Sequence, residues 1–274
     1  RSALLPPGTE VTVVELTDGR FLVSQRVDES DETTTVHGPR RSTTVASSDI
    51  VSFREARFLL GSDRFGRDVL TSLMLGGRFS ISIAALATLL ALLIGTTVGF
   101  TAATGGPVVD SALMRMVDGL MAFPLLFLLI LVAAVFRPGP IVLVALLGST
   151  SWMGLSRLVR GQVLTLRGRT FILAAQAAGS TPTRTWRRHY LPNLAGPLSQ
   201  DTALRLGDLV LAEATLSYLR LGLPPNLPTW GGLVPQGHRV MIDGWWIAAF
   251  SGAAIAALVI ALALIGDGIQ ERLA

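Results

Sequence analysis

A run of 25 residues without a charged side chain, Phe79–Ala103, limits the folds open to this chain more than any other feature. As an α-helix rising about 1.5 Å per residue, it would measure about 37 Å and cross the roughly 30 Å hydrocarbon core of a bilayer with some tilt. Only 15% of the residues are charged, against about 25% in soluble domains. We therefore expect this segment to be a transmembrane helix.

Four further segments have the length and apolar character of membrane crossings. They are residues 119–136, 140–159, 194–219 and 245–265. The first two are separated only by Arg137-Pro138-Gly139 and predict a hairpin, whereas Trp245 and Trp246 open the last one where an interfacial aromatic belt is expected. The sequence predicts an all-α integral membrane protein with five visible transmembrane helices.

The distribution of arginine predicts the orientation of these helices. Residues 157–193 contain seven Arg and no acidic residue, whereas residues 1–78 balance 10 Arg with 11 acidic residues. Short Arg-rich loops stay in the cytoplasm, so the loop 160–193 is expected inside and residues 1–58 outside. Residues 1–58 would then lie outside the cell, yet the sequence contains no segment that would export them. We therefore expect a sixth transmembrane helix before Arg1.

The external segment 1–58 has the alternating pattern of strands. Val11–Leu16 and Phe21–Val27 flank Thr17-Asp18-Gly19-Arg20, a sequence typical of a β-hairpin turn. We expect a small β-rich insert whose role the sequence does not reveal.

One predicted span carries charges. Asp201, Arg205 and Asp208 fall within about 60° of one another on a helix over 194–219, and Glu213 follows on the same helix. Charges at membrane depth line a water-filled path or pair with one another to fix helix packing, and the sequence favours neither explanation. Gly95 and Gly99 form a G-x-x-x-G pair, which predicts close helix packing.

The Arg-rich loop has an internal pattern of its own. Val163–Ala178 reads as a helix that Gly179 ends, and Thr181-Pro182 offers an N-cap and a first-turn Pro for a second helix over Thr183–Tyr190, before Leu191-Pro192. Two short helices joined at a small-residue elbow, with an Ala-rich surface, are suited to insertion into a groove on another protein. The same arginines would also attract anionic lipid.

The amino-acid composition excludes several kinds of catalytic and binding site. All 23 basic residues are Arg, so there is no P-loop Lys, and there is no Cys to act as nucleophile or metal ligand. His37, His189 and His238 are scattered, and neither His189 nor His238 is expected beside a Ser at membrane depth. We predict no catalytic residues, no cofactor and no metal site, and no nucleic-acid binding by a short loop anchored in the membrane at both ends.

Five blocks in order along the chain resemble the permease subunits of ABC importers, in the second-permease branch of the dipeptide, oligopeptide and nickel group. The signature loop of that family appears as LAAQAAG at 173–179, ending in HYLPN at 189–193. The other blocks are LGSDRFGRDVL at 60–70 with GRFS at 77–80; MRMVD at 114–118 with AFP at 122–124; RLVRGQV at 157–163; and EATLSYL at 213–219 with LGLPP at 221–225, PTWG at 228–231 and GDG at 266–268. Leu173 stands where the family has Glu, so that carboxylate is absent from the loop.

The resemblance implies a type I ABC importer permease fold over 59–274, half of a translocation path, in the plasma (inner) membrane of a bacterium or archaeon. It implies four kinds of neighbour: a second permease subunit, cytoplasmic ATP-binding subunits, an extracytoplasmic substrate-binding protein and membrane lipid. The residues expected to contact the ATPase are Ala174, Ala175, Gly179, Arg184, Arg187, Arg188, Leu191 and Pro192. The candidates for the translocation path are Asp201, Arg205, Asp208 and Glu213. Peptides, nickel chelates and other solutes all remain open as cargo, and an ion-coupled transporter or channel subunit is the alternative function.

Overall fold

The computed structural model describes residues 4–18, 21–24, 26–29, 33–37, 42–63, 66–136, 139–224 and 227–273. The chain divides into two compact units, one made of residues 1–78 and 225–254 and the other of residues 79–224 and 255–274. Two long helices, α1 (Val69–Thr104) and α9 (Met241–Leu273), contribute residues to both units.

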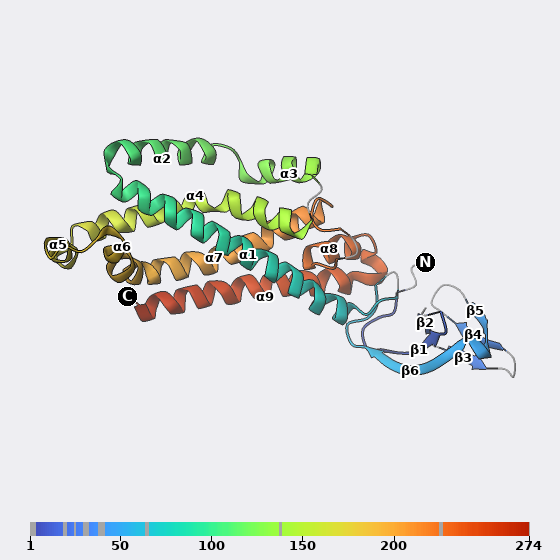
Figure 1. The fold of residues 1–274 in the computed structure, drawn as a ribbon. Helices are drawn as coiled ribbons and strands as arrows, with labels where there is room; N and C mark the ends of the chain where they lie inside the picture. The colour runs from blue at the N-terminus through green and yellow to red at the C-terminus, as the bar shows by residue number, and fades with distance from the viewer. Residues whose placement is uncertain are drawn as a thin grey trace. The chain divides into compact units, whose positions relative to one another are not determined.

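The first unit contains six short strands in two three-stranded antiparallel sheets (Figure 1). One sheet has the order β2-β1-β6 and the other β3-β4-β5. The strands are β1 (Thr9–Leu16), β2 (Phe21–Ser24), β3 (Arg26–Glu29), β4 (Thr33–His37), β5 (Ser42–Ala46) and β6 (Ile50–Phe58), with a 3₁₀ turn η1 (Ser47–Asp49) before β6.

Alternation along β1 supplies the core of this β region. Val14 and Leu16 point to one side and are buried with Val36 of β4, because side chains two apart on a strand share a face. The predicted hairpin is confirmed by the pairing of β1 with β2, although Gly19 and Arg20 of its turn lie outside the described residues. The predicted second strand over 21–27 is wrong in its length, because β2 ends at Ser24 and β3 pairs in the other sheet.

The N-terminus of α1 is fixed by side-chain capping and by two tryptophans of the same unit. The carboxylate of Asp68 accepts hydrogen bonds from the Thr71 backbone N–H (3.0 Å) and hydroxyl (2.6 Å), which satisfies first-turn donors. Trp230, the first residue of α8 (Trp230–His238), donates its indole N–H to the Leu73 carbonyl at 2.7 Å. Trp246 donates to the Ser62 carbonyl at 3.2 Å and is buried, whereas Trp245 is exposed; the interfacial belt expected for this pair stays a prediction.

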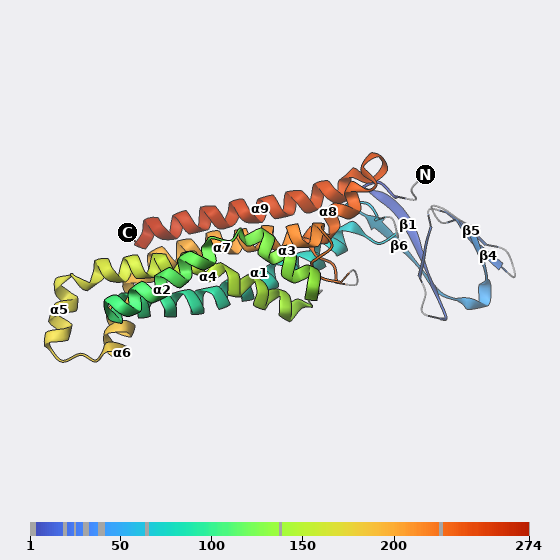
Figure 2. The same ribbon diagram turned by 90° about the horizontal axis from the view of Figure 1, so that it is seen from above.

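The second unit is a bundle of helices. Besides parts of α1 and α9, it contains α2 (Gly106–Met121), α3 (Leu125–Phe136), α4 (Pro140–Arg167), α5 (Thr170–Ala177), α6 (Pro182–Thr185), the π-helical turn η2 (Trp186–Tyr190) and α7 (Leu191–Tyr218). Figures 1 and 2 show α1, α4, α7 and the C-terminal part of α9 running side by side.

Small residues bring α1 and α4 into close contact. A Cβ atom built on Gly95 would lie 2.9 Å from the Trp152 carbonyl oxygen, and one on Gly99 would meet the Ser156 carbonyl oxygen. In the opposite direction, a Cβ on Gly148 of α4 would lie 2.9 Å from the Ala87 carbonyl oxygen. The prediction that Gly95 and Gly99 serve helix packing is confirmed, and we call this contact the α1–α4 seam.

The segment predicted as one helix over 119–136 is broken. α2 ends at Met121 and α3 begins at Leu125, with a bend of 75° between them. Pro124 explains the break, because it lacks a backbone N–H and disfavours helical geometry at Phe123.

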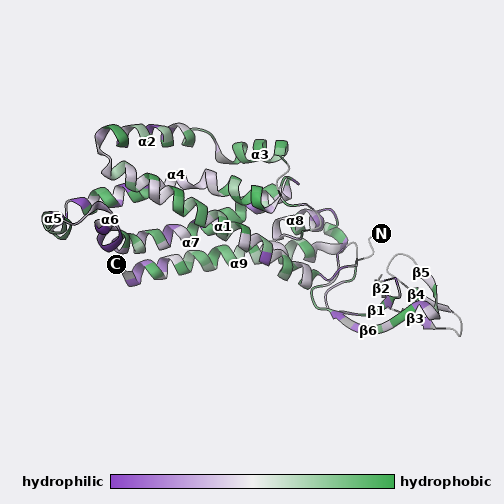
Figure 3. Ribbon diagram, viewed as in Figure 1, coloured by the Kyte–Doolittle hydropathy of each residue, from purple (hydrophilic) through white to green (hydrophobic). Residues whose placement is uncertain are grey.

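Among the described residues, three helices are long and apolar enough to cross a membrane, namely α1, α4 and α9, or four if the bent pair α2 and α3 counts as one span. Figure 3 shows apolar residues along these helices and a hydrophilic group at α6. α7 covers the predicted span 194–219 up to Tyr218, but it is not among these candidates, and four charged residues lie within it: Asp201, Arg205, Asp208 and Glu213.

Candidate functional site

The loop between α4 and α7 folds as an elbow of short helices, and we call residues 168–193 the elbow. The helix predicted over 163–178 is divided, because α4 ends at Arg167 and α5 begins at Thr170. Gly168 lies at the break, where the low helix propensity of glycine favours an end to α4. The first arm of the elbow is therefore a separate two-turn helix.

Gly179 ends α5 in the way the sequence predicts. Its φ of +76° lies in the left-handed region, and the Ser180 N–H donates to the Ala175 carbonyl (3.0 Å) while the Gly179 N–H donates to the Gln176 carbonyl (2.9 Å). These two bonds form a Schellman motif, which satisfies carbonyls that the helix leaves unpaired. No heavy atom lies within 4 Å of a Cβ built on Gly179, so its surroundings are open.

The second arm begins as predicted but continues further. Thr181 is the N-cap of α6, its hydroxyl accepting the Arg184 backbone N–H at 3.3 Å, and Pro182 occupies the first turn. The predicted end at Leu191-Pro192 is wrong, since the chain passes through the π-helical turn η2 directly into α7. The wider turn accommodates the Pro192 ring, and the Asn193 side-chain amide donates to the His189 carbonyl at 2.6 Å.

An aromatic group fixes the elbow to the bundle, and the sequence did not predict it. Trp186 packs against Phe100 of α1 with ring centroids 4.1 Å apart, and Tyr190 lies 5.8 Å from the same ring in an edge-on arrangement. Ile172 of α5 and Tyr190 are buried in one cluster. Burial raises the pKa of the Tyr190 phenol despite the opposing effect of Arg167.

The predicted contact residues of the elbow lie mostly at its surface. Ala175 is half-buried and the others are exposed: Ala174, Gly179, Arg184, Arg187, Arg188, Leu191 and Pro192. Leu173, in place of the family Glu, exposes 52% of its surface. The elbow therefore presents small side chains and Arg together, on arms held by the buried Ile172 and Tyr190.

The charged side chains of α7 separate into three environments. Asp201 and Arg205, one helical turn apart, form a bidentate ion pair with nitrogen–oxygen distances of 2.8 and 3.0 Å. Arg205 also donates to the Ser151 carbonyl of α4. This arrangement ties α7 to α4 and gives both side chains a partner, as packing requires.

Asp208 and Glu213 differ from that pair and from each other. Asp208 is exposed, and the structure does not join it to Arg205. Glu213 is fully buried and accepts hydrogen bonds from the Ser80 hydroxyl of α1 (3.0 Å) and the Ser217 hydroxyl (2.6 Å). The four charges predicted to lie on one path therefore do not form one cluster.

Two further ion pairs join α2 to α4. Arg160 pairs with Asp110 through two nitrogen–oxygen contacts, one of them at 2.6 Å, and Arg157 pairs with Asp118. The sequence showed these arginines only as part of a cationic stretch, because the acidic partners lie about 40 to 50 residues away.

These helices define a multi-span membrane protein. The family model of the binding-protein-dependent transport system inner membrane component matches residues 91–274. The chain therefore belongs to that family, and the predicted resemblance is confirmed. It is a multi-pass protein of the bacterial inner membrane.

Sequence relatives agree with this assignment. A putative peptide transport system permease protein of Brucella suis biovar 1 is 38% identical over 215 residues, which cover 78% of this chain and 72% of the relative. A dipeptide transport system permease protein of Bacillus subtilis is 33% identical over 78% of this chain and 67% of the relative. An oligopeptide transport system permease protein of Escherichia coli is 33% identical over 80% of this chain and 72% of the relative.

A solved structure of the MetNI methionine ABC transporter, in an inward-facing conformation, matches the fold. The TM-score is 0.63 at 18% identity, covering 75% of this chain and 97% of the matched chain. The predicted class, a helical permease fold with a small β-rich N-terminal segment, is confirmed.

Proposed function

We propose that this chain is a permease subunit of an ATP-driven peptide importer, forming half of the translocation path with a second permease. The names of its relatives support this assignment, since those at 33–38% identity are peptide, dipeptide and oligopeptide transport system permeases. An extracytoplasmic binding protein would deliver the peptide, and cytoplasmic ATPase subunits would supply the energy.

The elbow is the proposed contact with the ATPase. Its small exposed residues Ala174 and Gly179 allow a close approach, and Arg184, Arg187 and Arg188 offer charge complementarity. Closure of the ATPase pair on ATP would move the elbow. Because Trp186 and Tyr190 pack on Phe100 of α1, that movement would reach the bundle as a rigid-body change.

Within the path we propose a single polar contact from α7, the exposed carboxylate of Asp208. It would interact with the charged amino end of a peptide. Asp201 with Arg205, and Glu213 with Ser80, would instead hold α7 against its neighbours, because their polar atoms already have partners.

Substitution of Ala174 with Trp tests the elbow. Ala174 is exposed, so the variant is expected to fold and insert, while the indole blocks close docking. We expect loss of ATPase copurification and loss of ATP-dependent peptide uptake in proteoliposomes. Ala46→Trp, at an exposed position of β5, is the matched control and is expected to keep both.

Full peptide uptake by Ala174→Trp would contradict the docking proposal. Peptide uptake that persists without the ATPase subunits and follows an ion gradient would instead support the ion-coupled alternative.

A further inference from the structure

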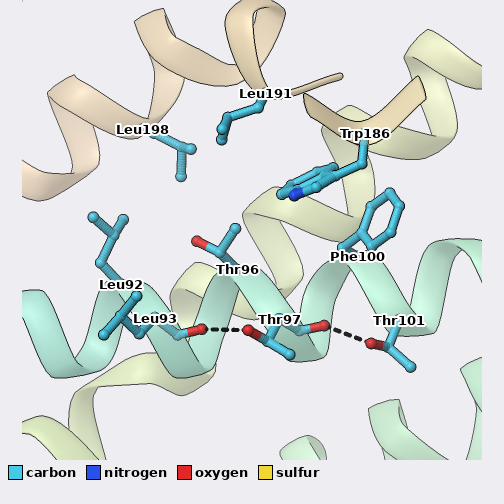
Figure 4. Close-up of a pocket in the computed structure, with 9 residues that line it drawn as sticks. All are labelled: Leu92, Leu93, Thr96, Thr97, Phe100, Thr101, Trp186, Leu191 and Leu198. Carbon is cyan, nitrogen blue, oxygen red and sulfur yellow. Dashed lines mark hydrogen bonds between the residues drawn. The ribbon is translucent and has the colours of Figure 1, made fainter. Parts of the chain in front are cut away.

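A pocket of about 370 Å³ lies between α1, the turn η2 and the start of α7. Figure 4 shows its walls, with Trp186, Leu191 and Leu198 facing α1. It is lined by Leu92, Leu93, Thr96, Thr97, Phe100, Thr101, Trp186, Leu191 and Leu198. Its volume falls at the lower end of the range of small-molecule sites, about 300–1,000 Å³.

The lining of the pocket includes one buried hydroxyl without a partner in the described part of the chain, that of Thr96. Its Oγ1 atom is buried and has no hydrogen-bond partner among the described residues. Three other threonines of α1 bond to the carbonyl four residues earlier: Thr97 to Leu93 and Thr101 to Thr97, both at 2.7 Å, and Thr104 to Phe100 at 2.9 Å. In Figure 4 the Thr96 side chain points into the space below Leu191 and Leu198. A buried hydroxyl without a partner is costly, so this atom indicates an occupant with a polar group.

The lining defines the chemistry of that occupant. The nine lining residues, all within the described part of the chain, include no charged side chain, so an ion or a peptide terminus would be left unpaired. The remaining walls are aliphatic or aromatic. Leu93 is 60% exposed and Leu191 41% exposed, so the pocket opens to the surroundings of a membrane-spanning helix, where acyl chains are the available apolar ligand.

Charge at the neighbouring turn favours an anionic headgroup. Arg187 and Arg188 follow Trp186 directly and are exposed, and residues 157–193 contain no acidic residue. Basic residues near the surface of an anionic membrane are attracted to its headgroups.

We propose that this pocket binds one anionic phospholipid. An acyl chain fills the space beside Leu92 and Leu198, an ester carbonyl oxygen accepts the Thr96 hydroxyl, and the phosphate lies near Arg187 and Arg188. The proposal depends on membrane insertion alone and not on peptide transport. A transporter that fails to carry peptides would leave it intact.

Fluorescence quenching tests the site in the complete transporter reconstituted in phosphatidylcholine nanodiscs. The probe is phosphatidylglycerol with a dibrominated acyl chain, and the signal is that of Trp186, obtained as the difference between wild type and Trp186→Phe. We expect quenching to saturate at a few mole per cent of the brominated lipid. Brominated phosphatidylcholine is expected to quench only in proportion to its mole fraction.

Two variants test the pocket itself. Thr96→Val keeps the shape but removes the hydroxyl, and is expected to weaken binding about three- to tenfold. Thr104→Val, on the same helix but outside the pocket, is the matched control and is expected to bind as wild type. Leu198→Phe fills the space and should remove saturable quenching.

Three outcomes would overturn the proposal: quenching without saturation in the wild type, equal midpoints for the two lipids, or unchanged binding by both Thr96→Val and Leu198→Phe. The first is also expected if a helix of the second permease occupies the pocket.

Discussion

The α1–α4 seam and the elbow both consist of small residues on helices, yet they lie in opposite surroundings. In the seam, a Cβ added to Gly95 or Gly99 would meet backbone of α4 at once. In the elbow, Ala174 is exposed, and a Cβ added to Gly179 would meet nothing within 4 Å. Small residues allow close approach in both places, but only the seam has its partner within this chain.

The difference shows how one sequence signal supports two conclusions. A small-residue pair inside an apolar run is satisfied by a neighbouring helix and concerns stability. A small-residue elbow rich in Arg, left exposed by its own chain, indicates a partner of another kind. Substitutions in the two regions should therefore separate loss of folding from loss of assembly.

Gly99→Leu should have the largest effect. The new side chain would displace the Ser156 carbonyl, which is backbone and cannot rotate away, so we expect a loss of at least about 3 kcal/mol and little folded protein. The measurement is the monodisperse yield and thermal stability of the solubilised protein.

The matched control is Gly161→Leu on α4, where a Cβ meets nothing within 4 Å. A Gly99→Leu variant as stable as Gly161→Leu would show that the seam is not close-packed.

Arg205→Ala should come next, because it removes a polar link that also has its partners within the chain. It leaves the half-buried Asp201 carboxylate and the Ser151 carbonyl without their donor, at a cost of about 1–3 kcal/mol. A double-mutant cycle with Asp201→Ala measures the coupling of the pair. Additive losses would mean that the ion pair within α7 contributes nothing to stability and that the bond from Arg205 to the Ser151 carbonyl acts alone.

Gly179→Ala should be milder than either, since it strains the backbone without a clash. A non-glycine residue at a φ of +76° costs about 1–2 kcal/mol, and Asn, which tolerates this region, should cost less. Hydrogen exchange at Ser180 should increase while the thermal stability of the bundle changes little. A global loss of stability comparable to that of Gly99→Leu would erase the contrast between elbow and seam.

Local signals were the part of this structure that sequence could predict. The cap at Thr181, the left-handed Gly179 and the pairing of β1 with β2 each depend on residues close together in the chain. Contacts that join distant segments were not predictable: neither the Asp110–Arg160 ion pair nor the stacking of Trp186 on Phe100 has a local pattern.

The helix breaks were predictable only in part. Pro124 is a recognised breaker, but the apolar run around it concealed the bend between α2 and α3. At Pro192 the same residue type did not end the helix, because a π-helical turn absorbed it. The burial of Glu213 could not be predicted from its neighbours in the sequence, because Ser80 of α1, which contacts it, lies 133 residues away.

Asp208→Asn should have the smallest effect on folding and the most specific effect on function. An exposed carboxylate contributes within about 0.5 kcal/mol to stability, so yield and thermal stability should match those of Asp267→Asn, a control at an exposed position of α9. If Asp208 faces the path, competition assays in proteoliposomes should show altered discrimination between peptides with free and with blocked amino termini. A variant that loses folded yield while keeping its peptide preference would instead place Asp208 with Asp201 and Arg205, among the charges that hold the helices together.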